Sequence, residues 1–236
     1  MLGNMRLILP FLSVLLMSQL AISQDKTVMF SDAVKSNIKK YNKQSDKVYE
    51  NGDIAKGQQL FDSLVKNHLV GSKFDDYSFK CVNSKKVKLS KIKKPVFIIT
   101  YSSWCLINKG EISALNKLSR NYKDQVQMIV VFWDVKSDMK KIARQFSSKI
   151  KVCYANESYR NDASVVANLK HTLGFPTSYF LNSDLEVVDI KRGGIAIPPR
   201  TPSKTAMEMN YTVFNERLSS FFEKNQQATQ LAATTD

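Results

Sequence analysis

The chain has 236 residues, of which 43% are hydrophobic, and its formal net charge at pH 7 is +14. This composition is sufficient for a sizeable core, and the chain shows no repeat of solenoid period and no long low-complexity tract. The basic residues are dispersed and no zinc spacing or nucleic-acid-binding signature accompanies them. They predict solvated lysine faces, and attraction to an anionic envelope surface or acidic partners rather than to nucleic acid.

The beginning of the chain has the pattern of a targeting segment. A short region containing Arg6 precedes an apolar run over residues 7–20, and Ala21-Ile22-Ser23 follows it. We therefore expect residues 1–23 to be a cleaved signal peptide, with a permanent membrane anchor as the alternative. Export would place the mature chain in the periplasm or outside the cell, where thiols tend to be oxidised.

Residues 24–70 are predicted to form a helical N-terminal extension. Apolar side chains at helical spacing indicate one helix from an N-cap at Ser31 or Asp32 to Asn51, and a second from Asp53 to Gly71. We expect this pair to pack on the domain that follows. A docking arm for a partner is the alternative.

From Gly71 the elements alternate between strands and helices and close on a hairpin, which predicts a mixed sheet covered on both faces. We assign the domain to residues 71–225 and a flexible tail to 226–236. The expected strands cover residues 77–82, 87–89, 94–101, 126–133, 150–154, 178–181 and 186–190, and the expected helices follow Cys105 and cover 136–146, 163–173 and 212–225.

A single cysteine lies where a buried strand turns into a helix. Residues 94–101 are apolar without alternation, as in a strand buried on both faces, and apolar residues recur at helical spacing after Cys105. We expect Cys105 at or beside the helix N-terminus, where unpaired N–H groups and the helix dipole favour a thiolate. A thiolate is the nucleophile that attacks disulfides or peroxides.

This stretch resembles the active site of thioredoxin-like proteins of the TlpA/ResA type, which usually reads W-C-x-x-C-x-x-E-x-P. Trp104, Cys105 and Glu111 match that pattern. Asn108 replaces the second cysteine, and Ser113 replaces the proline. The resemblance implies a thioredoxin-like three-layer α/β/α sandwich with a mixed central sheet, and no cofactor or metal.

A second stretch, residues 174–182, resembles the cis-proline loop of the same family and the strand that follows it. The resemblance implies that the Pro176 peptide bond is cis. It also implies that Phe175, Pro176 and Thr177 lie beside Cys105 and bind an extended substrate peptide.

The resemblance implies thiol-disulfide exchange with Cys105 as the catalytic nucleophile and Trp104 flanking it in the substrate-binding site. Asn108 occupies the resolving position and cannot resolve a mixed disulfide, so an external thiol would have to do so. The expected partners are protein thiols or disulfides, or a low-molecular-weight thiol. Glu111 is either an auxiliary group or a surface acid of the helix, and His171 is expected to be solvated near a helix C-terminus.

Two other functions remain open. One is a redox-inactive binding protein that uses the cis-proline groove for a protein partner. The other is a peroxidase, although Ile98 and Ser102 stand where peroxiredoxins usually have a proline and a threonine.

The other two cysteines, Cys81 and Cys153, lie in two separate predicted strands. The favoured interpretation is that they are small buried residues that never meet, because free cysteine is often buried. Pairing with each other, which would leave Cys105 as the odd thiol, is a second interpretation. In a third, one of them replaces the missing resolving cysteine.

Overall fold

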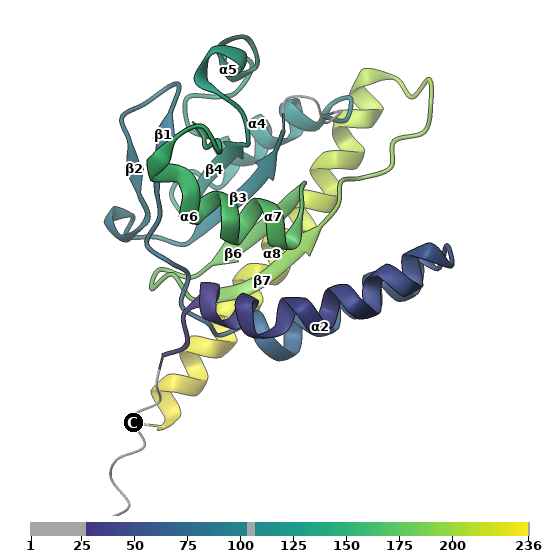
Figure 1. The fold of residues 1–236 in the computed structure, drawn as a ribbon. Coiled ribbons are helices and arrows are strands. Elements are labelled where there is room, and N and C mark those ends of the chain that lie inside the picture. Colours follow the sequence, from purple (N-terminus) through teal and green to yellow (C-terminus); the bar gives the residue numbers. More distant parts are fainter. Residues whose placement is uncertain (1–26, 103–106, 236) are drawn as a thin grey trace, which may run out of the picture.

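A seven-stranded mixed sheet is the middle layer of the fold (Figure 1). The computed structural model describes residues 27–102 and 107–235. The strand order is β2-β1-β5-β4-β3-β6-β7, and β3, β4 and β5 are parallel to one another, whereas the other neighbouring pairs are antiparallel. The strands are β1 (Ser78–Cys81), β2 (Val87–Lys88), β3 (Val96–Tyr101), β4 (Gln127–Phe132), β5 (Lys151–Tyr154), β6 (Thr177–Leu181) and β7 (Val187–Arg192).

The central strands are those whose sequences lack polar alternation. Every residue of β3 is buried, and β4 is buried from Met128 to its end. Strands that are apolar without alternation predict a sheet covered on both faces, and helices cover both faces here. The three-layer α/β/α sandwich with a preceding helical segment is confirmed.

One face of the sheet is covered by the N-terminal helices and by a second helical stretch. The N-terminal helices are α2 (Phe30–Glu50) and α3 (Ile54–Leu64), and α3 continues into a π-helical turn, Val65–Leu69. The second stretch comprises a 3-10 turn (Arg160–Asp162), α6 (Ala163–Val165), a π-helical turn (Val166–Lys170) and α7 (His171–Leu173).

The other face carries α4 (Glu111–Asn121), α5 (Lys136–Ala143) and α8 (Ser203–Thr235). Leu115 and Leu118 from α4, with Phe214, Leu218 and Phe221 from α8, are buried on the sheet in one cluster. This half of the core contains stacked rings from the sheet, with the centroids of Phe97 and Phe180 4.9 Å apart.

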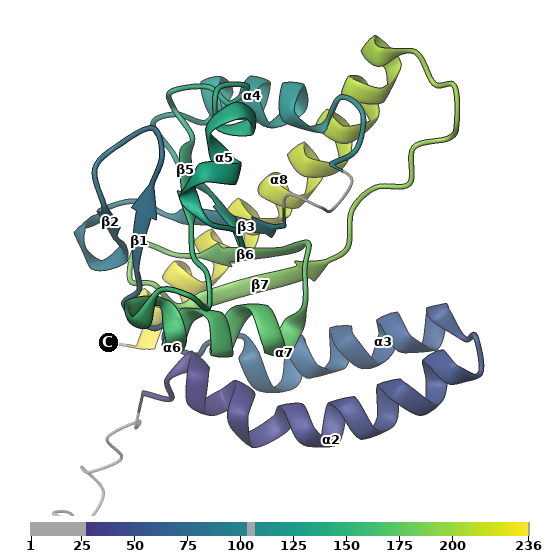
Figure 2. The ribbon, with the colours of Figure 1, turned by 45° about the horizontal axis from the view of Figure 1, so that its top comes forward.

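The N-terminal helices form a hairpin that is part of the core. The side chain of Asp53 accepts a hydrogen bond from the Lys56 N–H and caps α3. Phe30 and Phe61 are fully buried, and the Phe30 ring meets Tyr179 of β6 edge-on at 6.0 Å. Figure 2 shows the hairpin lying along β7. The expectation that these helices pack on the domain is confirmed.

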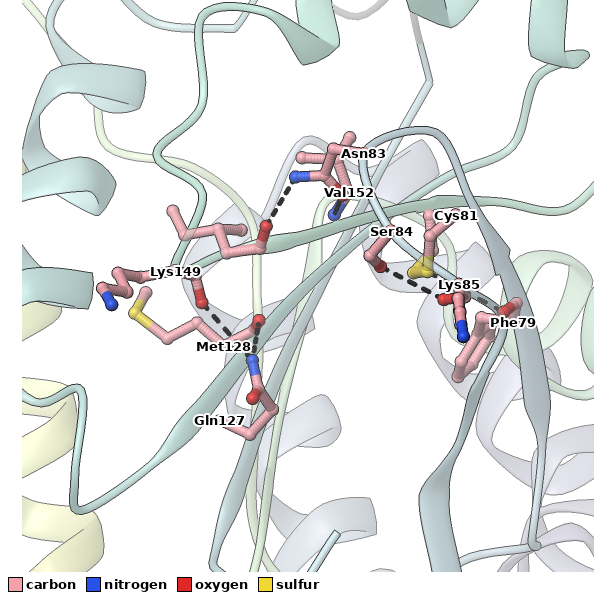
Figure 3. Close-up of a disulfide and its surroundings, with 11 residues drawn as sticks. Phe79, Cys81, Asn83, Ser84, Lys85, Gln127, Met128, Lys149 and Val152 are labelled. Atoms are coloured by element: carbon pink, nitrogen blue, oxygen red, sulfur yellow. Dashed lines mark hydrogen bonds between the residues drawn. A yellow bond between two sulfur atoms is a disulfide. The ribbon is translucent and has the colours of Figure 1, made fainter. Parts of the chain in front are cut away.

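Cys81 and Cys153 form a disulfide, so the favoured interpretation that they never meet is wrong. They are direct partners across the antiparallel pair of β1 and β5. Beside the bond, the Asn83 amide donates to the Ile150 carbonyl at 2.8 Å and accepts from the Val152 N–H at 3.0 Å (Figure 3). This order of strands, which the sequence does not show, brings the two cysteines together.

The C-terminal helix is longer than expected at both ends. It begins at Ser203, nine residues before the predicted start at Thr212, and it continues to Thr235, through most of the segment predicted as a tail. In the part of the chain that the structure describes, no helix is both long and apolar enough to span a membrane. The predicted signal peptide, residues 1–23, lies outside the described residues.

Candidate functional site

The candidate site lies at the end of β3, where the chain crosses to α4. Trp104 and Cys105 lie outside the described residues. The site is therefore described from the residues on either side of them. Ser102 directly follows β3 and is 1% exposed, and Ile107 and Asn108 lead into α4 and are partly buried. The crossing is therefore at the carboxyl end of the parallel strands.

Helix α4 begins later than predicted. Its first residue is Glu111, six positions after Cys105, and Gly110 precedes it with a φ of +82°. A Cβ atom on Gly110 would lie 2.4 Å from the Met207 nitrogen, because α8 packs directly against this turn. The prediction that the helix begins at or beside Cys105 is therefore wrong, because the helix begins six residues later. Gly110, a glycine in the left-handed region, lies between Cys105 and the helix.

Glu111 is buried at 3% exposure, so the interpretation as a surface acid is wrong. The Tyr101 hydroxyl donates to its carboxylate at 2.6 Å and the Asn108 N–H donates at 3.0 Å. Burial raises the pKa of Glu111, against the two hydrogen bonds and the charge of Arg217, which lower it. Burial likewise raises the pKa of Tyr101, and the neighbouring carboxylate adds to that effect. Glu111 thus holds the turn that carries Asn108.

The second predicted site segment leads into the N-terminal end of β6. The peptide bond between Phe175 and Pro176 is cis, as the resemblance implies. Phe175 and Pro176 are partly exposed, whereas Thr177 is fully buried. The Thr177 N–H donates to the Thr100 hydroxyl at 3.2 Å, so the side chain and the N–H of Thr177 face the protein interior. Phe175 and Pro176 are therefore the exposed part of this loop.

The loop after β7 connects the two segments. The Gly193 N–H donates to the Pro176 carbonyl at 2.9 Å, and the Asn108 side-chain amide donates to the Ile195 carbonyl. The structure thus brings Asn108, Glu111 and the cis-proline loop to one end of the sheet. Sequence reasoning missed the role of Ile195. The Gly193-Gly194 pair was a signal that the backbone there comes close to another segment.

Helix α8 closes the other side of this turn. Asn210 is fully buried and its side-chain amide donates to the Lys109 carbonyl at 3.1 Å. The Lys109 ammonium donates to the Thr201 carbonyl at 2.9 Å. No sequence pattern pointed to Asn210, because its contacts come from the docking of α8 on the start of α4.

The remaining titratable candidates lie apart from these contacts. The His171 side chain is 58% exposed and its Nε2 lies 3.3 Å from a Glu157 carboxylate oxygen. The expectation of a solvated histidine is confirmed. Within the described ranges, no three or more His, Cys, Asp or Glu side chains are grouped so that they could hold a metal ion.

The chain is similar to one known protein family. Residues 70–190 match the family model described as the AhpC/TSA family. No curated protein matches the chain.

Solved structures share the fold at low sequence identity. A Bacteroides thetaiotaomicron protein proposed to be a protein disulfide isomerase is 13% identical over 68% of this chain and 94% of its own, with a TM-score of 0.50. The thioredoxin domain of a thiol-disulfide oxidoreductase from Bacteroides vulgatus is 18% identical over 62% of this chain and 96% of its own, with a TM-score of 0.46. An exposed lipoprotein thioredoxin of Streptococcus pneumoniae is 17% identical over 58% and 98%, with a TM-score of 0.43. At such identities the likeness shows the fold alone.

Proposed function

The chain belongs to the AhpC/TSA family, and on that premise we propose that it is an exported monothiol protein that exchanges disulfides through Cys105. We further propose that it is of the TlpA/ResA type, with Asn108 in place of the resolving cysteine. The observation that carries the proposal is the cis-proline loop, tied through the 193–195 loop to the turn next to Cys105.

The proposed reaction has two steps. The Cys105 thiolate attacks one sulfur of a substrate disulfide, forming a mixed disulfide and releasing the other substrate sulfur as a thiolate. An external thiolate then attacks the mixed disulfide, and Cys105 leaves again as a thiolate. Asn108 carries no thiol, so the second step needs a protein thiol or a low-molecular-weight thiol from outside the chain.

The cysteine count supports a single reactive thiol. The sequence has three cysteines, and the disulfide between Cys81 and Cys153 uses two of them. Cys153 is fully buried and Cys81 is half-buried. Neither is therefore available as a resolving thiol while that bond is intact, and Cys105 remains.

We propose the following roles for the residues around Cys105. Trp104 limits access of water to the thiol. Phe175 and Pro176, which are partly exposed, contact the substrate peptide. Thr177 supports the loop from inside through Thr100 rather than through a contact with substrate. Glu111 orders the turn through Asn108.

The test is a comparison of the protein with Cys105→Ser in both thiol titration and adduct formation. Alkylation by iodoacetamide across a pH series would report on Cys105 alone, since the other two cysteines are bonded. The net charge of +14 favours an anionic thiolate, so we expect a pKa below the unperturbed value of about 8.5. We also expect a mixed disulfide with a pyridyl-disulfide peptide, which glutathione then releases. Cys105→Ser should abolish both signals.

Two outcomes would replace this proposal. Slow alkylation with an unperturbed pKa and no adduct would leave a redox-inactive protein that binds a partner at the cis-proline loop. Consumption of hydrogen peroxide that depends on Cys105 and exceeds the disulfide reaction would indicate a peroxidase.

A further inference from the structure

Arg192 stands beside the cis-proline loop. It is the last residue of β7, and its Cα partner across the antiparallel pair with β6 is Thr177, the residue after Pro176. The next residue, Gly193, donates its N–H to the Pro176 carbonyl at 2.9 Å. The backbone of Arg192 is thus fixed next to the loop that would receive a substrate.

Aromatic side chains of the N-terminal hairpin hold the guanidinium in place. Its central carbon lies 4.4 Å from the ring centroid of Phe61 and 5.9 Å from those of both Tyr41 and Tyr49. One Arg192 nitrogen donates to the Tyr49 hydroxyl at 2.6 Å. Stacking of this kind orients the planar group and is a property of arginine rather than lysine. The hairpin, which lies along β7 in Figure 2, therefore holds the guanidinium at the end of β7 whose backbone adjoins the cis-proline loop.

This cation has no carboxylate partner within the residues that the structure describes. Its neighbour Lys191 has one, since its ammonium is 3.7 Å from Asp189, which also pairs with Lys224 at 2.5 Å. Arg192 carries five N–H donors, of which one is donated to the Tyr49 hydroxyl at 2.6 Å. A half-buried guanidinium favours a carboxylate, because its flat arrangement of donors fits the two oxygens.

We propose that Arg192 determines substrate specificity by binding an acidic side chain of the polypeptide that docks at the cis-proline loop. The inference rests on the proposed disulfide exchange through Cys105. The substrate class is then a polypeptide with Asp or Glu close to its reactive disulfide. The net charge of +14 acts in the same direction, because it raises the encounter rate with acidic partners.

The experiment uses three peptides that differ in one residue next to a cysteine blocked by 2-thiopyridine, with Glu, Gln or Lys at that position. Release of thiopyridone gives the second-order rate constant at low and high salt. We expect the Glu peptide to react roughly tenfold faster than the Gln peptide, which corresponds to about 1.4 kcal/mol. Arg192→Gln should bring that ratio close to one.

Two further variants separate the local effect from the general charge. Lys56→Gln removes an exposed lysine from the same hairpin and should leave the ratio of Glu to Gln peptides unchanged. Arg192→Lys keeps the charge and the stem but loses the planar group, so it should retain only part of the ratio. It also provides the test if Arg192→Gln does not fold, which thermal unfolding would reveal.

The two proposals fail in distinguishable ways. If 2,2′-dithiodipyridine, a neutral small disulfide, does not react with Cys105, the proposed function fails. If it reacts but the Glu and Gln peptides react equally, the inference is overturned. A preference for Glu that survives in Arg192→Gln overturns it as well.

Discussion

The side-chain amide of Asn108 donates a hydrogen bond to the carbonyl of Ile195, and so ties the turn after Cys105 to the loop that follows β7. Asn108 is thus a structural residue of this turn. Two properties of the protein follow from this single residue. The turn is fixed from a segment far away in the sequence, and in the exchange that we propose for Cys105 the side chain three residues later has no thiol to release the mixed disulfide.

Replacement of Asn108 by cysteine should change how the mixed disulfide is released. With a thiol three residues after Cys105, we expect release without any external thiol, at a cost of about 0.5–1.5 kcal/mol of stability for the lost hydrogen bond. Asn108→Ser is the matched control, since it removes the amide and adds no thiol. Quenched samples on non-reducing gels would follow release, and equal rates for the two variants would contradict the prediction.

Glu111→Gln should change how stability depends on pH. Burial raises the pKa of Glu111 above its usual 4.5, so the folded protein holds this proton more tightly than the unfolded chain. Stability from this group is fully present below the unfolded pKa and falls as pH rises through the folded pKa. A tenfold difference in proton affinity between the two states corresponds to about 1.4 kcal/mol. The variant should therefore gain stability relative to the native protein as pH rises through this window.

Urea unfolding at several pH values gives the difference in unfolding free energy between Glu111→Gln and the native protein. An amide can still accept from the Asn108 N–H and donate to the Tyr101 oxygen, so the variant should fold. Glu208→Gln, on the exposed surface of α8, is the control. It gives the effect on stability of removing a charge that is not buried. If the stability of Glu111→Gln relative to the native protein stays constant or falls as pH rises, the buried carboxyl does not titrate as we expect.

Removal of the disulfide by Cys81→Ser and Cys153→Ser together should lower the unfolding free energy by about 4 kcal/mol. The bond closes a long loop, with a sequence separation of 72, and the chain-entropy relation for such a loop gives that value. Denaturant unfolding with and without a strong reductant provides the measurement. The reductant should destabilise the native protein and leave the double variant unchanged, whereas an equal effect on both would point to another cause.

The sequence predicts the fold well where the signal is local. The buried strands β3 and β4 are visible as apolar runs without alternation, and the cap of α3 at Asp53 is visible as a residue type. The cis bond before Pro176 follows from family resemblance, because no local pattern distinguishes it from a trans bond.

What the sequence does not predict depends on contacts between distant elements. The pairing of Cys81 with Cys153 requires β1 to lie next to β5, which is a property of strand order. The burial of Glu111 requires Tyr101 below it and α8 beside it, and a glutamate at a helix start otherwise suggests a surface acid. The part of α8 before the predicted start packs against the turn at Gly110, where Asn210 bonds the Lys109 carbonyl and the Met207 backbone lies close to Gly110.

The packing of the N-terminal helices has a consequence for synthesis on the ribosome. Phe30 and Phe61 belong to the cluster that the hairpin forms with the sheet, and the Tyr179 ring that Phe30 contacts belongs to β6. Helices α2 and α3 leave the exit tunnel before β6, so their apolar faces stay uncovered until the chain has been translated through β6. Nascent chains halted before β6 should accordingly be recognised by chaperones that bind exposed apolar segments.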